Sequence, residues 1–78
     1  MSKFLVARLC LVGGKISTYE DYAVVEASDI INACEIYNKT YRTEKVSMGN
    51  CLSEITDDIP EGKLQDWQAI KLLLENAK

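Results

Sequence analysis

Two pairs of adjacent carboxylates are the residues of this chain that come nearest to catalytic chemistry. Glu20 is followed by Asp21, and Asp57 is followed by Asp58; paired carboxylates can serve as general acid and general base. Adjacent acids in a strand point to opposite faces, however, and adjacent acids in a loop are usually solvated. The sequence also has no histidine, no G-x-S-x-G motif and no glycine loop of the phosphate-binding kind. We therefore predict that the chain is not an enzyme and uses no cofactor.

The cysteines offer a second kind of chemistry. Cys10, Cys34 and Cys51 are odd in number, and the sequence has no C-x-x-C motif and no histidine. A framework of disulfides or a four-ligand zinc site cannot easily be assembled from them. We predict three reduced thiols that pack as small hydrophobic side chains, and no bound metal. A Cys10–Cys51 disulfide between neighbouring strands is the alternative.

Acidic residues gather late in the sequence. They are Glu54, Asp57, Asp58, Glu61 and Asp66, with Lys63 as the single base among them. An exposed loop and the N-terminus of a helix, where the helix dipole favours acids, explain this stretch structurally. Contact with a basic partner surface is the functional interpretation, and it makes Asp57, Asp58 and Glu61 candidate partner-binding residues.

A small basic and aromatic group is the candidate for nucleic-acid binding. Its members are Lys39, Tyr41, Arg42 and Lys45. Three cations neutralise few phosphates, and the net charge of -3 argues against the positive field that supplies most nonspecific nucleic-acid affinity. Lys39 and Arg42 also suit the last turn of a helix, where cations offset the dipole. Nucleic-acid binding is therefore the disfavoured alternative.

The elements that must position these residues begin with a β-hairpin. Two runs rich in β-branched and aromatic residues, 3–12 and 15–27, flank Gly13-Gly14. A three-residue turn, which we favour, pairs even positions with even positions. It predicts one buried face made of Leu5, Ala7, Leu9 and Leu11 opposite Tyr19, Ala23 and Val25, with Asp21 as an awkward member.

The other face of this hairpin holds a second group of candidates. The same pairing places Arg8 beside Glu20 and Tyr22, where opposite charges can meet across the strands. That even-numbered face also carries Phe4 and Val6, and it is more apolar than a solvated face needs to be. A second copy, a host protein or the last helix could cover it. We therefore count Arg8, Glu20 and Tyr22 among the candidate partner-binding residues.

Two helices and a third strand follow. Ser28, as N-cap, and Asp29 predict a helix that ends near Arg42, with Ile30, Cys34, Tyr37 and Tyr41 along its buried stripe. Alternation over 44–55 predicts the third strand, and the segment 56–62 has turn chemistry. The order is therefore ββαβα. It predicts an α+β domain over residues 1–78, with a three-stranded, mainly antiparallel sheet in the order 2-1-3 and both helices on one face.

The last helix, predicted over 63–77, contains the single tryptophan. Its apolar face holds Leu64, Trp67, Ile70, Leu74 and Ala77, widened by Leu72 and Leu73. We predict that Trp67 is a core anchor under the sheet. The alternative is a partly exposed interface anchor, because tryptophan belongs to the residue types that dominate binding hot spots.

The first half of the chain resembles a known group of proteins. The residues that carry the resemblance are Phe4-Leu5-Val6, the run 22–29 and Ala33. They are similar to the opening ββα unit of very short accessory proteins encoded by phages and prophages. Some proteins of that group inhibit host enzymes or defence systems, so the resemblance implies inhibition of a host protein. It assigns no role to any single residue.

The sequence therefore predicts a small cytoplasmic domain that binds another macromolecule, a protein, as an inhibitor or adaptor. A nucleic-acid-binding domain and a purely structural subunit of a homo-oligomer are the alternatives. The apolar strand face and the broad last helix predict a dimer. No run of about 18 apolar residues occurs, so we expect no membrane-spanning segment.

Overall fold

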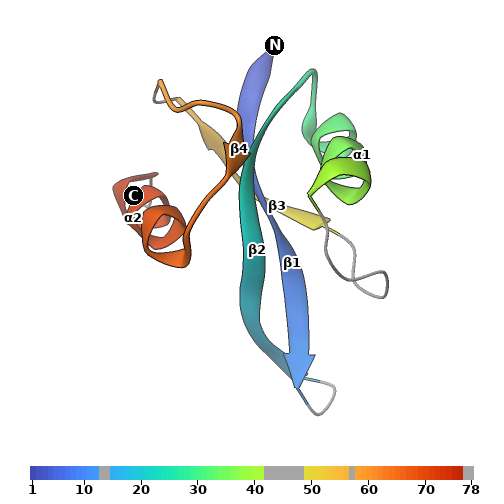
Figure 1. Ribbon diagram of the computed structural model, residues 1–78, viewed down its shortest axis with the longest axis vertical. Helices are drawn as coiled ribbons and strands as arrows, with labels where there is room; N and C mark the ends of the chain where they lie inside the picture. Colours follow the sequence, from blue (N-terminus) through green and yellow to red (C-terminus); the bar gives the residue numbers. More distant parts are fainter. Residues whose placement is uncertain (13–14, 42–48, 57, 77–78) are drawn as a thin grey trace.

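The computed structural model describes residues 1–12, 15–41, 49–56 and 58–76, which form an α+β fold (Figure 1). In chain order the elements are β1 (Ser2–Val12), β2 (Lys15–Ala27), α1 (Ile30–Thr40), β3 (Gly49–Ile55), β4 (Gly62–Lys63) and α2 (Asp66–Asn76). The four strands make one antiparallel sheet in the order β3-β1-β2-β4. The α+β class, the two helices and the place of β3 beside β1 confirm the prediction.

The fourth strand corrects the predicted three-stranded sheet. Gly62 pairs with Val24 and Lys63 pairs with Ala23, and the amide of Leu64 donates to the carbonyl of Tyr22 at 2.9 Å. A strand of two residues has no room for the alternation of polar and apolar positions by which a strand is identified in a sequence. The sequence analysis therefore assigned Gly62 to a turn and did not predict β4.

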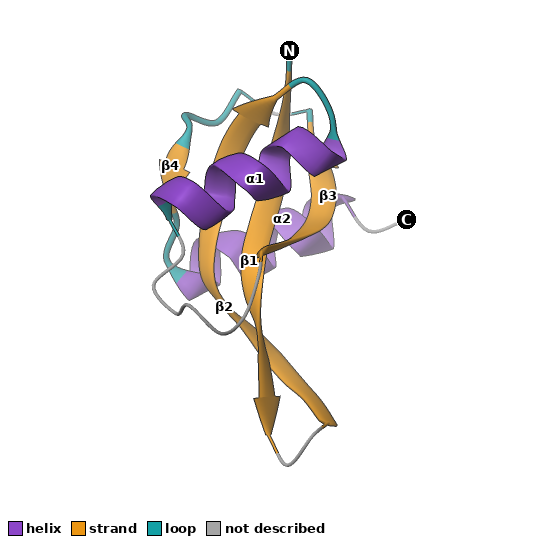
Figure 2. Ribbon diagram, turned by 90° about the vertical axis from the view of Figure 1, so that its right-hand side faces the viewer, coloured by secondary structure: helices purple, strands orange, loops and turns teal. Residues whose placement is uncertain are grey.

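The two helices lie on opposite faces of the sheet, which overturns the prediction that both cover one face. Figure 1 shows α1 and α2 on either side of the strands, and Figure 2 shows α1 in front of the sheet with α2 behind it. Four consecutive residues of β1, Phe4 to Ala7, are buried. A strand buried on both faces reads as a continuous apolar run. The even-numbered face that seemed to need a partner is covered by α1, so it no longer argues for a dimer.

A β-bulge in β2 decides which residues share a face. Val6 pairs with Ala23 but Arg8 pairs with Glu20, so Asp21 and Tyr22 together oppose one residue of β1. Asp21 has a positive φ of 54°, the left-handed conformation that aspartate tolerates better than most residues. The predicted pairing of even with even positions is right from Arg8 to Cys10, wrong for Phe4 and Val6, and wrong again for Leu11 and Val12, beyond a second register shift. It failed there because a bulge moves every later residue of the strand to the other face.

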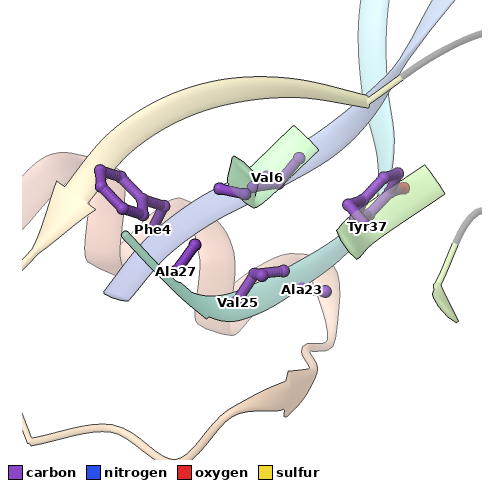
Figure 3. Close-up of a cluster of buried hydrophobic side chains, with 7 residues drawn as sticks. Phe4, Val6, Ala23, Val25, Ala27 and Tyr37 are labelled. Carbon is purple, nitrogen blue, oxygen red and sulfur yellow. The ribbon is translucent and has the colours of Figure 1, made fainter. Parts of the chain in front are cut away.

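Each sheet face consequently has its own core. Beneath α1 lie residues from even positions of β1 and odd positions of β2: Phe4, Val6, Ala23, Val25 and Ala27 (Figure 3). Beneath α2 lie Leu5, Ala7 and Tyr22, with Ile55 from β3. The predicted buried set mixed members of these two cores. The pairing of Val12 with Lys15 also leaves only residues 13–14 between paired positions, one fewer than the favoured turn, and Gly13-Gly14 itself lies outside the described residues.

Helix α1 begins one residue later than predicted. Asp29, and not Ser28, is the N-cap: its side chain accepts a hydrogen bond from the amide of Asn32 at 2.7 Å. An aspartate at this position satisfies an otherwise unpaired amide and suits the helix dipole. The two helices have 11 residues each. In the described part of the chain, no helix combines the length and apolar character that crossing a bilayer requires.

Tyr37 packs α1 against β1, β2 and β3. Its side chain is fully buried among the residues under α1 (Figure 3), and its hydroxyl donates to the carbonyl of Asp21 at 2.6 Å. The ring also lies against the backbone of Gly49 in β3. The amide of Gly49 donates to Oδ1 of Asn38 at 2.7 Å. One aromatic side chain therefore contacts the bulge in β2, the start of β3 and the core between them.

Candidate functional site

Three of the six exposed large hydrophobic side chains among the described residues lie on the outward surface of α2. Ala69 and Leu72 bury this helix against the sheet. Because residues advance about 100° per position around a helix, Trp67 and Leu74 face away from that contact and Ile70 lies beside them. Their exposed fractions are 66%, 71% and 51%. We call these three residues, Trp67, Ile70 and Leu74, the α2 stripe.

The α2 stripe corrects the predicted orientation of the last helix. Trp67 is not a core anchor, so the alternative assignment as a partly exposed interface residue is the one that the structure permits. Both candidate faces of this helix are apolar at helical spacing, and the smaller residues Ala69 and Leu72 were the ones that packed on the sheet. The sequence signal for an exposed apolar face was that α2 has more apolar positions than one buried face requires. A surface helix needs only one such face.

A groove runs beside the α2 stripe. It is a hollow of about 300 Å³ whose lining comes from α2 and from the segment before it: Ile59, Leu64, Trp67, Gln68, Lys71, Leu72 and Glu75. Hydrogen bonds hold the segment before α2 in place: Nζ of Lys3 donates to the carbonyl of Ile59 at 2.7 Å. The amide of Leu64 is bonded to β2. The groove is thus a formed feature beside Trp67.

Charged residues border the stripe on both sides. Asp66 is exposed at the start of α2, next to the Ile70 side of the stripe. Lys71 and Glu75 are exposed on the opposite side and lie one helical turn apart, so one edge of the stripe carries a cation and an anion in sequence. The surface therefore has an apolar centre with a polar rim, the usual anatomy of a protein-binding patch.

The hairpin candidates are only partly brought together. Arg8 does meet acids, as predicted: its Nη2 lies 2.5 Å from Oε2 of Glu20 and its Nε lies 3.0 Å from Oδ2 of Asp21. Its side chain is only 12% exposed, so Arg8 uses its charge in contacts within the fold and offers little surface to a partner. Tyr22 lies on the other side of the sheet, in the core under α2. Burial there raises the pKa of the Tyr22 hydroxyl, with the charge of Asp66 as a smaller cause.

The acidic candidates do not form a single cluster. One carboxylate oxygen of Glu61 accepts a hydrogen bond from the amide of Glu26 at 2.8 Å, which fastens the segment before β4 to β2. Asp58 is exposed, and Asp57 lies outside the described residues. Within the described residues, no group of acids, cysteines and histidines is arranged to hold a metal ion.

The basic candidates are described only in part. Lys39 is exposed in the last turn of α1. The ring of Tyr41 packs partly buried against the core under α1, with its centroid 6.4 Å from that of Tyr37. Arg42 and Lys45 lie outside the described residues. Tyr41 is thus explained by packing.

A second exposed apolar pair was missed by the sequence analysis. Ile30 is 57% exposed and Ile31 is 73% exposed at the start of α1, although the predicted helix stripe buried Ile30. They line a shallow hollow with Phe4, Asp29 and Glu54. The first turn of α1 extends beyond the part of the helix that packs through Ala33 and Tyr37.

Cys34 and Cys51 are free thiols, so the alternative of a Cys10–Cys51 disulfide is wrong. Cys51 packs against the core under α1. Burial raises the pKa of its thiol, with smaller contributions from Cys34 and Glu54, while a hydrogen bond with the backbone of Ser53 acts in the opposite direction.

We predict that Cys51 reacts slowly with iodoacetamide in the folded chain, because the thiolate is the nucleophile and a raised pKa leaves less of it. In a C10S/C34S background, the midpoint of alkylation rate against pH should lie above the ordinary cysteine value of about 8.5. A short peptide containing Cys51 is the control. A midpoint equal to that of the peptide, or below it, contradicts the prediction.

Comparison with known proteins found no relative of this chain: no protein-family model matches it, and neither curated proteins nor solved structures give a match.

Proposed function

We propose that this chain is a small protein-binding domain that acts as an inhibitor or adaptor, and that the α2 stripe is its docking surface. The observation that carries the proposal is the 66% exposure of Trp67 in an apolar stripe that Ile70 and Leu74 continue along α2. Free proteins seldom expose contiguous apolar patches of this kind, and exposed tryptophans are enriched among residues that dominate binding energy.

The layout of α2 supports a helical mode of docking. Trp67, Ile70 and Leu74 occupy positions i, i+3 and i+7, which is how one face of an amphipathic helix anchors into an apolar groove of a partner. Lys71 and Glu75 form a charged rim that remains near solvent. A partner that presents an apolar groove with a mixed polar border would complement this surface.

The kind of partner and the compartment follow from less direct observations. The resemblance of the first half of the chain to short phage-encoded proteins favours a host protein as the partner. The free thiols of Cys34 and Cys51 favour a reducing compartment such as the cytoplasm. The group proposed for nucleic-acid binding has three cations in the sequence, Lys39, Arg42 and Lys45, which neutralise few phosphates in a chain of net charge -3. Protein binding is therefore the function that we propose.

Photocrosslinking tests the proposed surface directly. A photoreactive amino acid placed at position 74 should crosslink to a protein of defined mass in cells that produce the chain. The same residue placed at position 31 is the matched control, since Ile31 is equally exposed on the other side of the sheet. We expect an adduct from position 74 that Trp67→Glu abolishes. Equal adducts from both positions, or none from position 74, would refute the proposal.

A further inference from the structure

Two cysteines lie on elements that pack against each other, Cys34 on α1 and Cys51 on β3. We propose that Cys34 and Cys51 are a redox pair that closes into a disulfide when the glutathione pool around the chain is oxidised and reopens when that pool is reduced. The juxtaposition that carries the proposal is the alignment of α1 along β3, which sets the two side chains opposite each other. The inference goes beyond the proposed function, because α1 covers the face of the sheet opposite the α2 stripe (Figure 1).

Contacts at both ends of α1 fix how this helix lies along β3. Ile30 and Ile31, at its start, line a hollow together with Glu54, near the end of β3. Tyr37, toward its other end, lies against Gly49, the first residue of β3. Figure 2 shows α1 in front of the sheet on this side. Going toward the start of α1 therefore corresponds to going toward the end of β3.

The two cysteines lie one matched step from a contact that the structure shows. Oδ1 of Asn38 accepts a hydrogen bond from the amide of Gly49 at 2.7 Å. Cys34 comes four residues before Asn38, and four residues of helix rise about 6 Å. Cys51 comes two residues after Gly49, and two residues of strand rise about 6.7 Å. The two steps agree to within about 1 Å, so Cys34 and Cys51 lie at the same level of the contact.

Each cysteine also lies on the side of its element that faces the other. Asn38 reaches β3, and a residue four positions earlier is turned by only about 40° around the helix, so Cys34 is on the β3 side of α1. Cys51 packs against the core under α1, and it pairs with Val6, a member of that core. Both cysteines are partly buried. The two side chains therefore meet within the α1–β3 contact.

The two sulfurs also interact electrostatically. Burial is the largest cause of the raised pKa of the Cys51 thiol, and the negative charge of Cys34 is the next. Because the interaction of two charges weakens with distance, this contribution supports the closeness that the alignment indicates. Both thiols are free, so the structure is that of the reduced pair.

Thiol–disulfide exchange with glutathione disulfide closes the pair. We expect Cys34 to react first, since the raised pKa of Cys51 leaves less thiolate there. The Cys34 thiolate attacks one sulfur of glutathione disulfide, whose S–S bond breaks and releases one glutathione thiolate. The Cys51 thiolate then attacks the Cys34 sulfur and displaces the second glutathione. The chain loses two electrons and the protons of two thiols, and glutathione disulfide becomes two molecules of reduced glutathione.

Peptide mapping of the wild-type chain gives the first test, so no variant has to fold. Trypsin cuts after lysine and arginine and leaves the three cysteines on separate peptides, 9–15, 16–39 and 46–63. After equilibration with glutathione disulfide and alkylation of the remaining thiols, we expect 16–39 joined to 46–63. A link from 9–15 to either of them as the main product overturns the inference. Glutathione on both Cys34 and Cys51, with no link between them, overturns it too.

The single variants measure how well the fold holds the pair together. Cys34→Ser and Cys51→Ser each leave one member, which can only form a mixed disulfide with glutathione. Those mixed disulfides should need at least about tenfold more glutathione disulfide than the wild-type link needs, because the second thiol is supplied within the chain. Circular dichroism of each variant checks that it is folded. In concentrated urea the advantage of the wild type should fall by about tenfold, and an advantage equal to that of the folded chain overturns the inference.

A thermal melt gives the third test, on the oxidised and the reduced wild-type chain. A link between α1 and β3 restricts the unfolded chain, so oxidation should raise Tm by about 10 °C. Addition of a reductant should return Tm to its original value, since the exchange is reversible. An oxidised chain that melts no higher than the reduced chain shows that the link does not fit this alignment, and it overturns the inference.

Discussion

Tyr37→Ala should cost about 3–5 kcal/mol of unfolding free energy and leave much of the chain unfolded. The side chain is fully buried, so its removal leaves a cavity in the core under α1. It also removes the hydrogen bond to the carbonyl of Asp21 at 2.6 Å. A domain of this length buries only about 60% of its unfolded surface and has little stability in reserve. Urea denaturation followed by circular dichroism measures the loss.

Two further variants divide the effect of Tyr37 into its parts. Tyr37→Phe keeps the ring and loses the hydroxyl, so it should cost about 1 kcal/mol. Tyr41→Ala removes a ring from the same helix that is only half buried, and it should cost clearly less than Tyr37→Ala. A Tyr37→Ala chain whose stability lies within about 1 kcal/mol of the wild type would show that this core can close around the cavity.

Gly49→Ala should destabilise the chain by about 2–3 kcal/mol, toward the upper end of what overpacking costs. An added Cβ would lie 3.0 Å from Cε1 and 3.1 Å from Cγ of Tyr37, and closer still to Cδ1. The ring is fully buried, so it can move aside only by displacing the core side chains packed around it. The backbone cannot easily shift away, because the amide of Gly49 is held by Asn38 at 2.7 Å.

A double-mutant cycle shows whether the Gly49 effect arises at the ring. Gly49→Ala should cost much less in a Tyr37→Leu background, which gives a coupling energy above about 1 kcal/mol. Ser53→Ala is the control in the same strand, since its partly exposed hydroxyl bonds only a neighbouring carbonyl at 3.4 Å. It should change stability by less than about 0.5 kcal/mol. Additive effects of the two substitutions would contradict the contact.

The hairpin illustrates how far the sequence determines the fold. The β-branched runs on either side of Gly13-Gly14 predicted both strands correctly, because strand signals are local. The pairing of residues across the strands was predicted correctly only between two register shifts, from Arg8 to Cys10. Asp21 looked misplaced in an apolar set, and that misfit marked the position of the irregularity. A single extra residue in one strand moves the residues beyond it to the opposite face of the sheet. Hydrophobic periodicity alone does not predict where such a residue occurs.

The candidate site shows a different limit. The apolar positions of the last helix were recognised, but Trp67 was assigned to the core because it shares an apolar helix face with Leu64 and Ile70. The sheet face under α2 is already filled by Leu5, Ala7 and Tyr22, so the small side chain of Ala69 fits against it. Which of two apolar faces packs inward depends on the volume available at a distant strand. Local spacing does not specify that volume.

The central position of β1 has a consequence for the chain while it is being synthesised. β1 lies between β2 and β3, and its hairpin partner ends at Ala27 whereas β3 ends only at Ile55. At a translation rate of about 5–20 residues per second, one edge of β1 waits roughly 1–6 s for its partner. During that interval the emerging chain presents a strand edge with unpaired amides and carbonyls, the surface on which nascent chains aggregate or recruit chaperones.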